Sequence, residues 1–149
     1  MPTNTQSMDY AGSSAPLLSE ILTKVNNAKM KEDKVKVLKQ NDSVPLRQVL
    51  KGAFDPKIVW DLPEGTPPYK ENEAPAGTEH TLLYTESKRL WHFVKGADNR
   101  TSKTRKEMLY IQMLEGLHAD EAKLLIAVKE KNLNNIYKGL TDAVVKEAF

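Results

Sequence analysis

Residues 102–131 read SKTRKEMLYIQMLEGLHADEAKLLIAVKEK and carry the densest apolar periodicity of the chain. Their apolar residues recur at helical spacing in two stripes: Met108, Leu109, Ile111, Met113, Leu114 and Leu117, then Leu124, Leu125 and Val128. Gly116 interrupts the run between the stripes, and Asp120 and Glu121 suit the first turn of a new helix. The stretch therefore predicts two antiparallel helices joined by a tight turn, on which the rest of the chain packs.

Further helices are expected on both sides of this pair. The first is predicted at 18–29 with Ser19 as N-cap, and the second at 31–40. The third begins after an Asp42 or Ser43 cap, with Pro45 in its first turn. The fourth covers 79–95, after a Thr78 cap and before Gly96, and the last runs from a Thr141 cap to the end of the chain. The alternation KVKVLK at 34–39 also permits a short strand. Gly52 weakens the third helix and is expected to end it, and 134–139 reads as a break. The fold class expected is mostly α, a compact bundle of six to seven short helices.

One long loop interrupts this helical pattern. Five of the eight prolines lie within residues 55–78: Pro56, Pro63, Pro67, Pro68 and Pro75. Prolines at this density exclude a regular helix, while Trp60, Leu62 and Tyr69 can anchor the loop on the helices. Residues 1–16 are polar and lack periodicity, so they are expected to form a flexible arm before a single domain at 17–149.

Composition restricts the classes of site and compartment. The chain has no cysteine, which excludes disulfides, thiolate metal sites and a thiol nucleophile. No apolar run approaches the roughly 20 residues that span a bilayer, and residues 1–16 lack the features of a signal peptide. A soluble, cytosolic protein is expected.

Seven basic residues stand against Asp98 alone between positions 88 and 106. Those that could contact phosphates are Arg89, Lys95, Arg100, Lys103, Arg105 and Lys106. The same residues could equally form a solvated face with ordinary ion pairs. Because Ala119–Val128 is apolar, and acidic at its start, residues 103–131 suit a core hairpin better than a DNA-reading helix–turn–helix.

No motif in the sequence fixes the geometry of a catalytic or cofactor site. His80, His92 and His118 are isolated, and neither HExxH nor the glycine-rich phosphate motifs GxGxxG and GxxxxGK occur. We therefore expect no metal, no cofactor and no catalytic residues, and rank an enzyme third among the functions considered.

Several separated strings together resemble a known family. They are FDPKIVW at 54–60, LPEGTPPY at 62–69, APAGTEHTLLY at 74–84, LWHFVKG at 90–96 and IQMLEGLHADEAKLL at 111–125. In this order the chain resembles, over residues 17–149, a family of small uncharacterised proteins of large contractile-tailed bacteriophages, cyanophages included. The resemblance implies a place in the cytoplasm of an infected bacterium, or in the virion, and brings no functional residues with it.

The function expected first is that of a non-enzymatic protein-interaction module. Its partner would be a host factor or a phage assembly component, held by the arm and by the loop residues Trp60, Leu62, Pro67, Pro68 and Tyr69. The alternative is a nucleic-acid-associated factor that uses the basic residues named above. A membrane partner is not expected.

Overall fold

Nine helical segments make up the part of the chain that our computed structural model describes, residues 16–73 and 81–149. They are α1 (Leu18–Asn27), α2 (Lys31–Gln40), α3 (Val44–Phe54), α4 (Leu83–Glu86), the 3-10 helix η1 (Ser87–Phe93), α5 (Lys103–Gly116), α6 (Ala119–Lys129), α7 (Leu133–Ile136) and α8 (Asp142–Ala148). Within these ranges there is no strand, only one isolated β-bridge between Trp60 and Val94. The predicted all-α class is confirmed, and the 34–39 alternation is helical.

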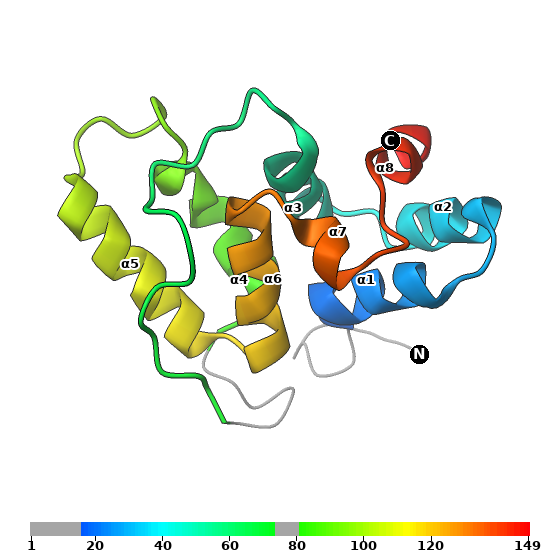
Figure 1. Ribbon diagram of the computed structural model, residues 1–149, viewed down its shortest axis with the longest axis horizontal. Coiled ribbons are helices and arrows are strands. Elements are labelled where there is room, and N and C mark those ends of the chain that lie inside the picture. Colours follow the sequence, from blue (N-terminus) through cyan, green and yellow to red (C-terminus); the bar gives the residue numbers. More distant parts are fainter. Residues whose placement is uncertain (1–15, 74–80) are drawn as a thin grey trace, which may run out of the picture.

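The helices form an elongated bundle with α3 at its middle (Figure 1). On one side α1, α2 and α8 pack together, and on the other α6 contacts α3 and α5. Leucines fill the centre, among them Leu22, Leu50 and Leu114, each at most 1% exposed. The predicted arm at 1–16 lies outside the described residues except for Pro16, as do Thr78 and Glu79.

The pair of helices predicted from 102–131 is present as α5 and α6, but α5 turns a different face to the core. Its buried residues are Lys106, Tyr110, Met113 and Leu114, whereas Met108 is 43% exposed. Tyr110, Met113 and Leu114 repeat at helical spacing, and Lys106, four residues before Tyr110, extends the same face by one turn. Because lysine counts as hydrophilic, a hydrophobicity pattern does not assign Lys106 to the buried face of α5. The prediction that Met108 belongs to the buried face is wrong.

The prediction of one regular α-helix over 79–95 is wrong. The structure has the single turn of α4 followed by η1, which ends at Phe93. Ser87 Oγ donates to the Tyr84 carbonyl oxygen at 3.0 Å, a local bond that competes with the α-helical ladder. Val94 is then extended and pairs with Trp60, so the chain leaves the helix before Gly96, whose φ is +86°.

Four other predicted boundaries agree with the structure only in part. Ser43 Oγ accepts from the Leu46 N–H and Thr141 Oγ1 from the Val144 N–H, so both predicted caps are confirmed. Ser19 caps nothing, because α1 starts one residue earlier, with Glu20 Oε1 accepting the Leu17 N–H at 2.7 Å. The break expected at 134–139 begins later than predicted, because α7 continues to Ile136.

Gly52 does not end α3, which continues to Phe54. A Cβ atom at this position would lie 2.7 Å from Cζ2 of Trp60 and 3.2 Å from Cγ1 of Val128. The glycine is needed because an indole ring from the loop lies directly on the helix backbone, a close approach that no other residue permits.

Glu121 joins the beginnings of three helices. Its side chain is 1% exposed and belongs to the first turn of α6. Oε2 accepts the Ser19 N–H of α1 at 2.9 Å, and Oε1 accepts the Leu83 N–H of α4 at 3.3 Å. A carboxylate at helix N-termini satisfies N–H groups that have no partner inside their own helices.

Candidate interaction surface

The described part of the proline-rich loop, residues 55–73, runs from the end of α3 across the bundle and then between α5 and α6 (Figure 1). Its first half is paired with the chain that follows η1. The Asp61 N–H donates to the Phe93 carbonyl oxygen, and the Lys95 N–H donates to the Val59 carbonyl oxygen, each at 2.7 Å. Residues 59–61 are therefore one short extended segment on the surface of an otherwise helical protein.

Charged side chains of α5 and α6 hold the loop in place. Lys106 Nζ lies 3.0 Å from Asp61 Oδ2 and donates to the Asp98 carbonyl oxygen at 2.7 Å. Lys129 Nζ donates to the carbonyl oxygens of Pro63 at 2.8 Å and Gly65 at 2.9 Å. Farther along, Glu115 Oε2 accepts the Lys70 N–H at 2.7 Å. The backbone N–H and C=O groups of the loop, which form no regular secondary structure, are thus satisfied in part by side chains of α5 and α6.

The five loop residues predicted to bind a partner do not act together. Trp60, Leu62 and Tyr69 are half-buried and pack against the core, and the Trp60 Nε1–H donates to the Gly52 carbonyl oxygen at 3.1 Å. Leu62, half-buried Pro67 and exposed Pro68 line one pocket of about 200 Å³ over Tyr110. Burial raises the pKa of Tyr69, and the negative charge of Glu71 raises it further. Three of the five are therefore mainly anchors.

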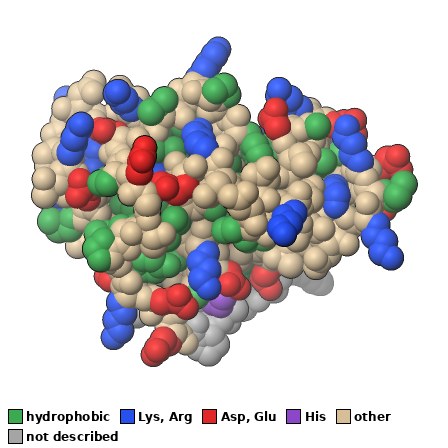
Figure 2. Space-filling view, in the orientation of Figure 1, with side chains coloured by type: hydrophobic (Ala, Val, Ile, Leu, Met, Phe, Trp, Pro, Cys, Tyr) green, Lys and Arg blue, Asp and Glu red, His purple; other side chains and the backbone are tan. Residues whose placement is uncertain are grey.

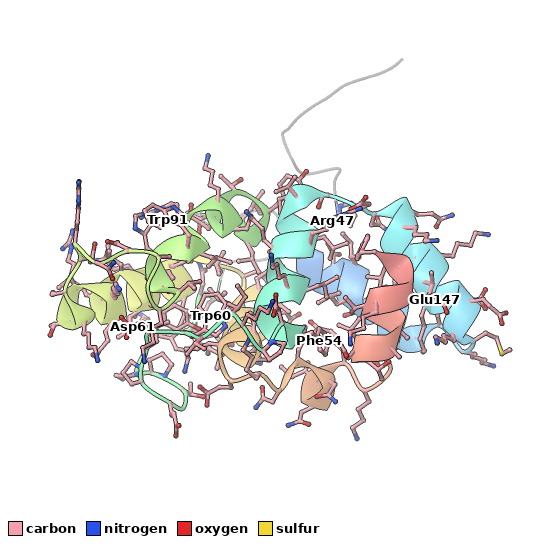
Figure 3. All side chains as sticks on the ribbon, turned by 90° about the horizontal axis from the view of Figure 1, so that it is seen from above. Arg47, Phe54, Trp60, Asp61, Trp91 and Glu147 are labelled. Atoms are coloured by element: carbon pink, nitrogen blue, oxygen red, sulfur yellow. The ribbon has the colours of Figure 1, made fainter. Side chains whose placement is uncertain are left out.

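A groove that no pattern in the sequence indicates lies beside the extended segment and follows its length. The groove has a volume of about 590 Å³, and we call it the edge groove. It is lined by Ala53, Phe54, Asp55, Pro56, Ile58, Val59, Trp60, Leu62, Glu64, Lys129, Glu130 and Lys131. Figure 3 looks onto this face and shows Asp61, Trp60 and Phe54 following one another across it.

Exposed apolar side chains border the edge groove. Val59 in its wall is 50% exposed, and Trp91 is also 50% exposed. Ile58 and Trp60 connect the edge groove to a smaller pocket of about 170 Å³ that Trp91 lines. On the other side, Phe54 and Pro56 continue into a groove of about 640 Å³ that extends to Phe149, which is 37% exposed. Adjoining hollows with exposed apolar rims are typical of binding surfaces.

Lys131 forms one wall of the edge groove and holds an unusual backbone conformation. Its φ is +59°, the left-handed position after α6 where glycine is usual. The Asn132 N–H donates to the Ala127 carbonyl oxygen at 3.0 Å, which completes the helix cap. The Lys131 Nζ donates to the carbonyl oxygens of Gly52 and Asp55, so its ammonium lies at the negative end of α3. Burial lowers the pKa of Lys131.

The predicted phosphate-binding residues are only partly a surface. Lys106 is 3% exposed and bound to Asp61, so it cannot reach an outside phosphate, and its place in that set is wrong. Arg89 pairs with Glu86 at 3.0 Å. The remaining members are exposed: Lys95, Arg100, Lys103 and Arg105. On the face in Figure 2, basic and acidic side chains are interspersed.

A buried carboxylate organises the turn before α5. Asp98 Oδ2 lies 2.8 Å from His92 Nδ1 and accepts from Thr101 Oγ1 at 2.7 Å. Its Oδ1 accepts the backbone N–H groups of Arg100 and Thr101. The hydrogen bond from His92, followed by that from Thr101, holds the pKa of Asp98 well below its usual value. The carboxylate fixes the imidazole, and through it the ring of Trp91, which stacks on His92 at 3.8 Å.

Metal binding and membrane crossing find no support in residues 16–73 and 81–149. No three His, Asp or Glu side chains there are grouped to hold a metal ion. Nor does any helix in those ranges have the length and apolar content that a bilayer crossing requires.

Comparison with known proteins gives one result. Neither the curated proteins nor the solved structures contain a match to this chain. Residues 21–135 match a family of unknown function, DUF6433. The match begins within α1, ends within α7 and includes the whole edge groove. The chain therefore belongs to DUF6433, a family of unknown function.

Proposed function

We propose that this protein is a non-enzymatic interaction module that holds a protein partner on the face formed by the edge groove. The observation that carries the proposal is the set of three adjoining hollows around residues 56–60, bordered by Val59 and Trp91. Aromatic and aliphatic side chains in such hollows supply most of the affinity in protein interfaces.

The rigidity of the loop supports the same proposal. Hydrogen bonds from Trp60, Lys106 and Lys129 fix it before any partner arrives. A partner that binds a fixed loop does not have to supply the free energy of ordering it. The binding residues expected are thus Ile58 and Val59, with Trp60 and Leu62 beneath them as supports.

The resemblance to a family of small proteins from contractile-tailed bacteriophages suggests the kind of partner. We propose a host protein or a component of phage assembly. The predicted arm at residues 1–16 is proposed as a second contact with that partner, since an arm can become ordered as it binds.

A crosslinking experiment tests the proposal by comparing two exposed valines, one inside the edge groove and one outside it. Val59 is 50% exposed in the edge groove and Val44 is 69% exposed at the start of α3. A photo-crosslinking residue is placed at each position, and the protein is recovered from the cells that produce it. We expect one discrete partner to be crosslinked from position 59 and not from position 44.

The binding constant of that partner then gives a quantitative check. Val59→Asp is expected to weaken binding by at least about tenfold, and Val44→Asp by less than about twofold, with the helical circular dichroism of both variants unchanged. Equal crosslinking from both positions, or equal affinity of both variants, would remove the proposal.

A second candidate function rests on the pocket beside Trp91. This pocket is lined by Lys51 and Lys88 and by no carboxylate, next to the exposed indole. Cations beside an aromatic ring suit single-stranded nucleic acid. Binding of a fluorescent oligonucleotide that weakens steeply with salt, and that is lost in Trp91→Ala, would favour this function over the first.

A further inference from the structure

We infer that the partner enters as an extended peptide that adds a strand to the free edge of the segment containing Trp60. The inference rests on the proposed function and names the form of its partner. Peptides bind in this way wherever a sheet edge leaves backbone N–H and C=O groups unpaired.

The backbone at residues 58–62 has one used side and one unused side. In an antiparallel pair, alternate residues direct their N–H and C=O groups to opposite sides. The Val59 C=O and the Asp61 N–H point to residues 93–95 and are bonded there, each at 2.7 Å. Trp60, between them, directs its N–H and C=O groups the other way. Within the described part of the chain, no hydrogen bond forms to these two groups, to the Ile58 carbonyl oxygen or to the Leu62 N–H.

The edge groove lies on this unused side. Its lining includes Ile58, Trp60 and Leu62 but none of residues 93–95. Val94 instead lines the smaller pocket on the paired side. The volume of about 590 Å³ is also lined by Phe54 at the end of α3 and by residues 129–131 at the end of α6, so an added strand would contact both the edge and these residues.

Prolines fix the length of strand that can be added. Pro56 and Pro63 bracket the free edge, and neither has an N–H to continue a ladder. Four groups remain to bond the peptide: the Ile58 carbonyl, both groups of Trp60 and the Leu62 N–H. About five peptide residues, at roughly 3.3 Å each, span them. The same prolines keep the edge too short for association into larger sheets.

The lining also indicates which peptide fits. Side chains alternate between two faces of a strand, so every second residue of the peptide would lie over Ala53, Phe54 and Pro56, which favours apolar side chains. The lining holds three carboxylates against two ammonium groups. Both ammonium groups, those of Lys129 and Lys131, already donate to carbonyl oxygens, and Lys129 is also paired with the carboxylate of Glu130. Glu64 is exposed, so the peptide is neutral or basic and carries a lysine or arginine at that end.

The experiment uses the absence of cysteine from the chain. Glu64→Cys gives a single thiol at the rim of the edge groove. A disulfide from this thiol to a peptide of alternating valine and threonine takes the place of the ion pair with Glu64 and tethers the peptide. Tethering gives an effective concentration of about 1 mM, so even weak strand addition is populated. The matched control is Glu32→Cys, an exposed glutamate on α2, with the same peptide.

Amide hydrogen exchange is then followed by NMR, residue by residue. In the untethered protein, the Asp61 and Lys95 N–H groups are expected to exchange slowly and those of Trp60 and Leu62 quickly. Tethering at position 64 should slow Trp60 and Leu62 by at least about tenfold and leave Asp61 unchanged. N-methylation of the peptide residues that face the edge should abolish this slowing, and N-methylation of the intervening residues should not.

Two results would overturn the inference. One is slow exchange of the Trp60 N–H in the free protein, which would show that the edge is already paired. The other is unchanged exchange of Trp60 and Leu62 with the peptide tethered at position 64. Either result would leave the proposed function standing if position 59 still crosslinks to a partner, so the two failures can be told apart.

Discussion

Replacing Lys106 with methionine is expected to lower the free energy of unfolding by about 3 kcal/mol. The side chain of Lys106 is 3% exposed, and that of its partner Asp61 is 20% exposed. The substitution removes the hydrogen bond to Asp61 at 3.0 Å and the one to the Asp98 carbonyl oxygen at 2.7 Å. Methionine keeps most of the buried stem, so the loss is electrostatic rather than one of packing.

The magnitude follows from what is left behind. Breaking a buried ion pair by removing one partner costs about 3–5 kcal/mol because the other charge stays desolvated. Asp61 is partly exposed and regains some hydration, which places the expected loss at the lower end of that range. For a chain of this length, about 3 kcal/mol lowers the melting temperature by roughly 6 to 12 °C.

Urea unfolding of a double-mutant cycle measures the effect. Lys106→Met and Asp61→Leu alone should each be less stable than the original chain. The double variant should recover to within about 1 kcal/mol of the original chain, because two apolar side chains leave no unpaired charge. A single variant within about 0.5 kcal/mol of the original chain, or a double variant as unstable as the sum of the singles, would refute the reasoning.

Two further outcomes follow from the loop and the turn before α5. Gly52→Ala, which in an exposed helix would stabilise by about 1 kcal/mol, should instead destabilise by about 1–3 kcal/mol, since its Cβ would displace the Trp60 indole; a higher urea midpoint would contradict this. Folding lowers the pKa of Asp98 through the bond from His92, so its contribution is complete above about pH 4 and is lost as the pH falls below that value. The urea midpoint should therefore drop as the pH falls below about 4, and Asp98→Asn should flatten that drop; parallel curves for the two proteins would argue against this role.

The starts of α3 and α8 were predictable from the sequence. Ser43 and Thr141 act locally, because a cap and its N–H partner lie three residues apart. The α5–α6 pair was equally clear, since its apolar residues are close in sequence. The burial of Lys106 and Glu121 could not be predicted, because a charged residue is expected at the surface unless its buried partner is known. Their partners, Asp61 and Ser19, lie 45 and 102 residues away.

The candidate site shows the same division. Trp60, Leu62 and Tyr69 were recognised as loop anchors, and all three do pack on the core. Apolar residue type alone could not separate anchors from contacts, because Val59 and Trp60 are neighbours that face opposite ways. The bridge between Trp60 and Val94 joins residues 34 positions apart, and no local pattern indicates such a pairing. The free backbone edge is visible only when both segments are in place.

Glu121 has a consequence for the order in which the protein assembles. Its carboxylate loses its water only when the amides of Ser19 and Leu83 replace that water, and these residues lie 102 and 38 positions away along the chain. Before α1 and α4 arrive, the hydrated carboxylate resists closure around it. Packing α6 without α1 or α4 would leave this carboxylate without the Ser19 or the Leu83 N–H, so we expect the three helix beginnings to dock together.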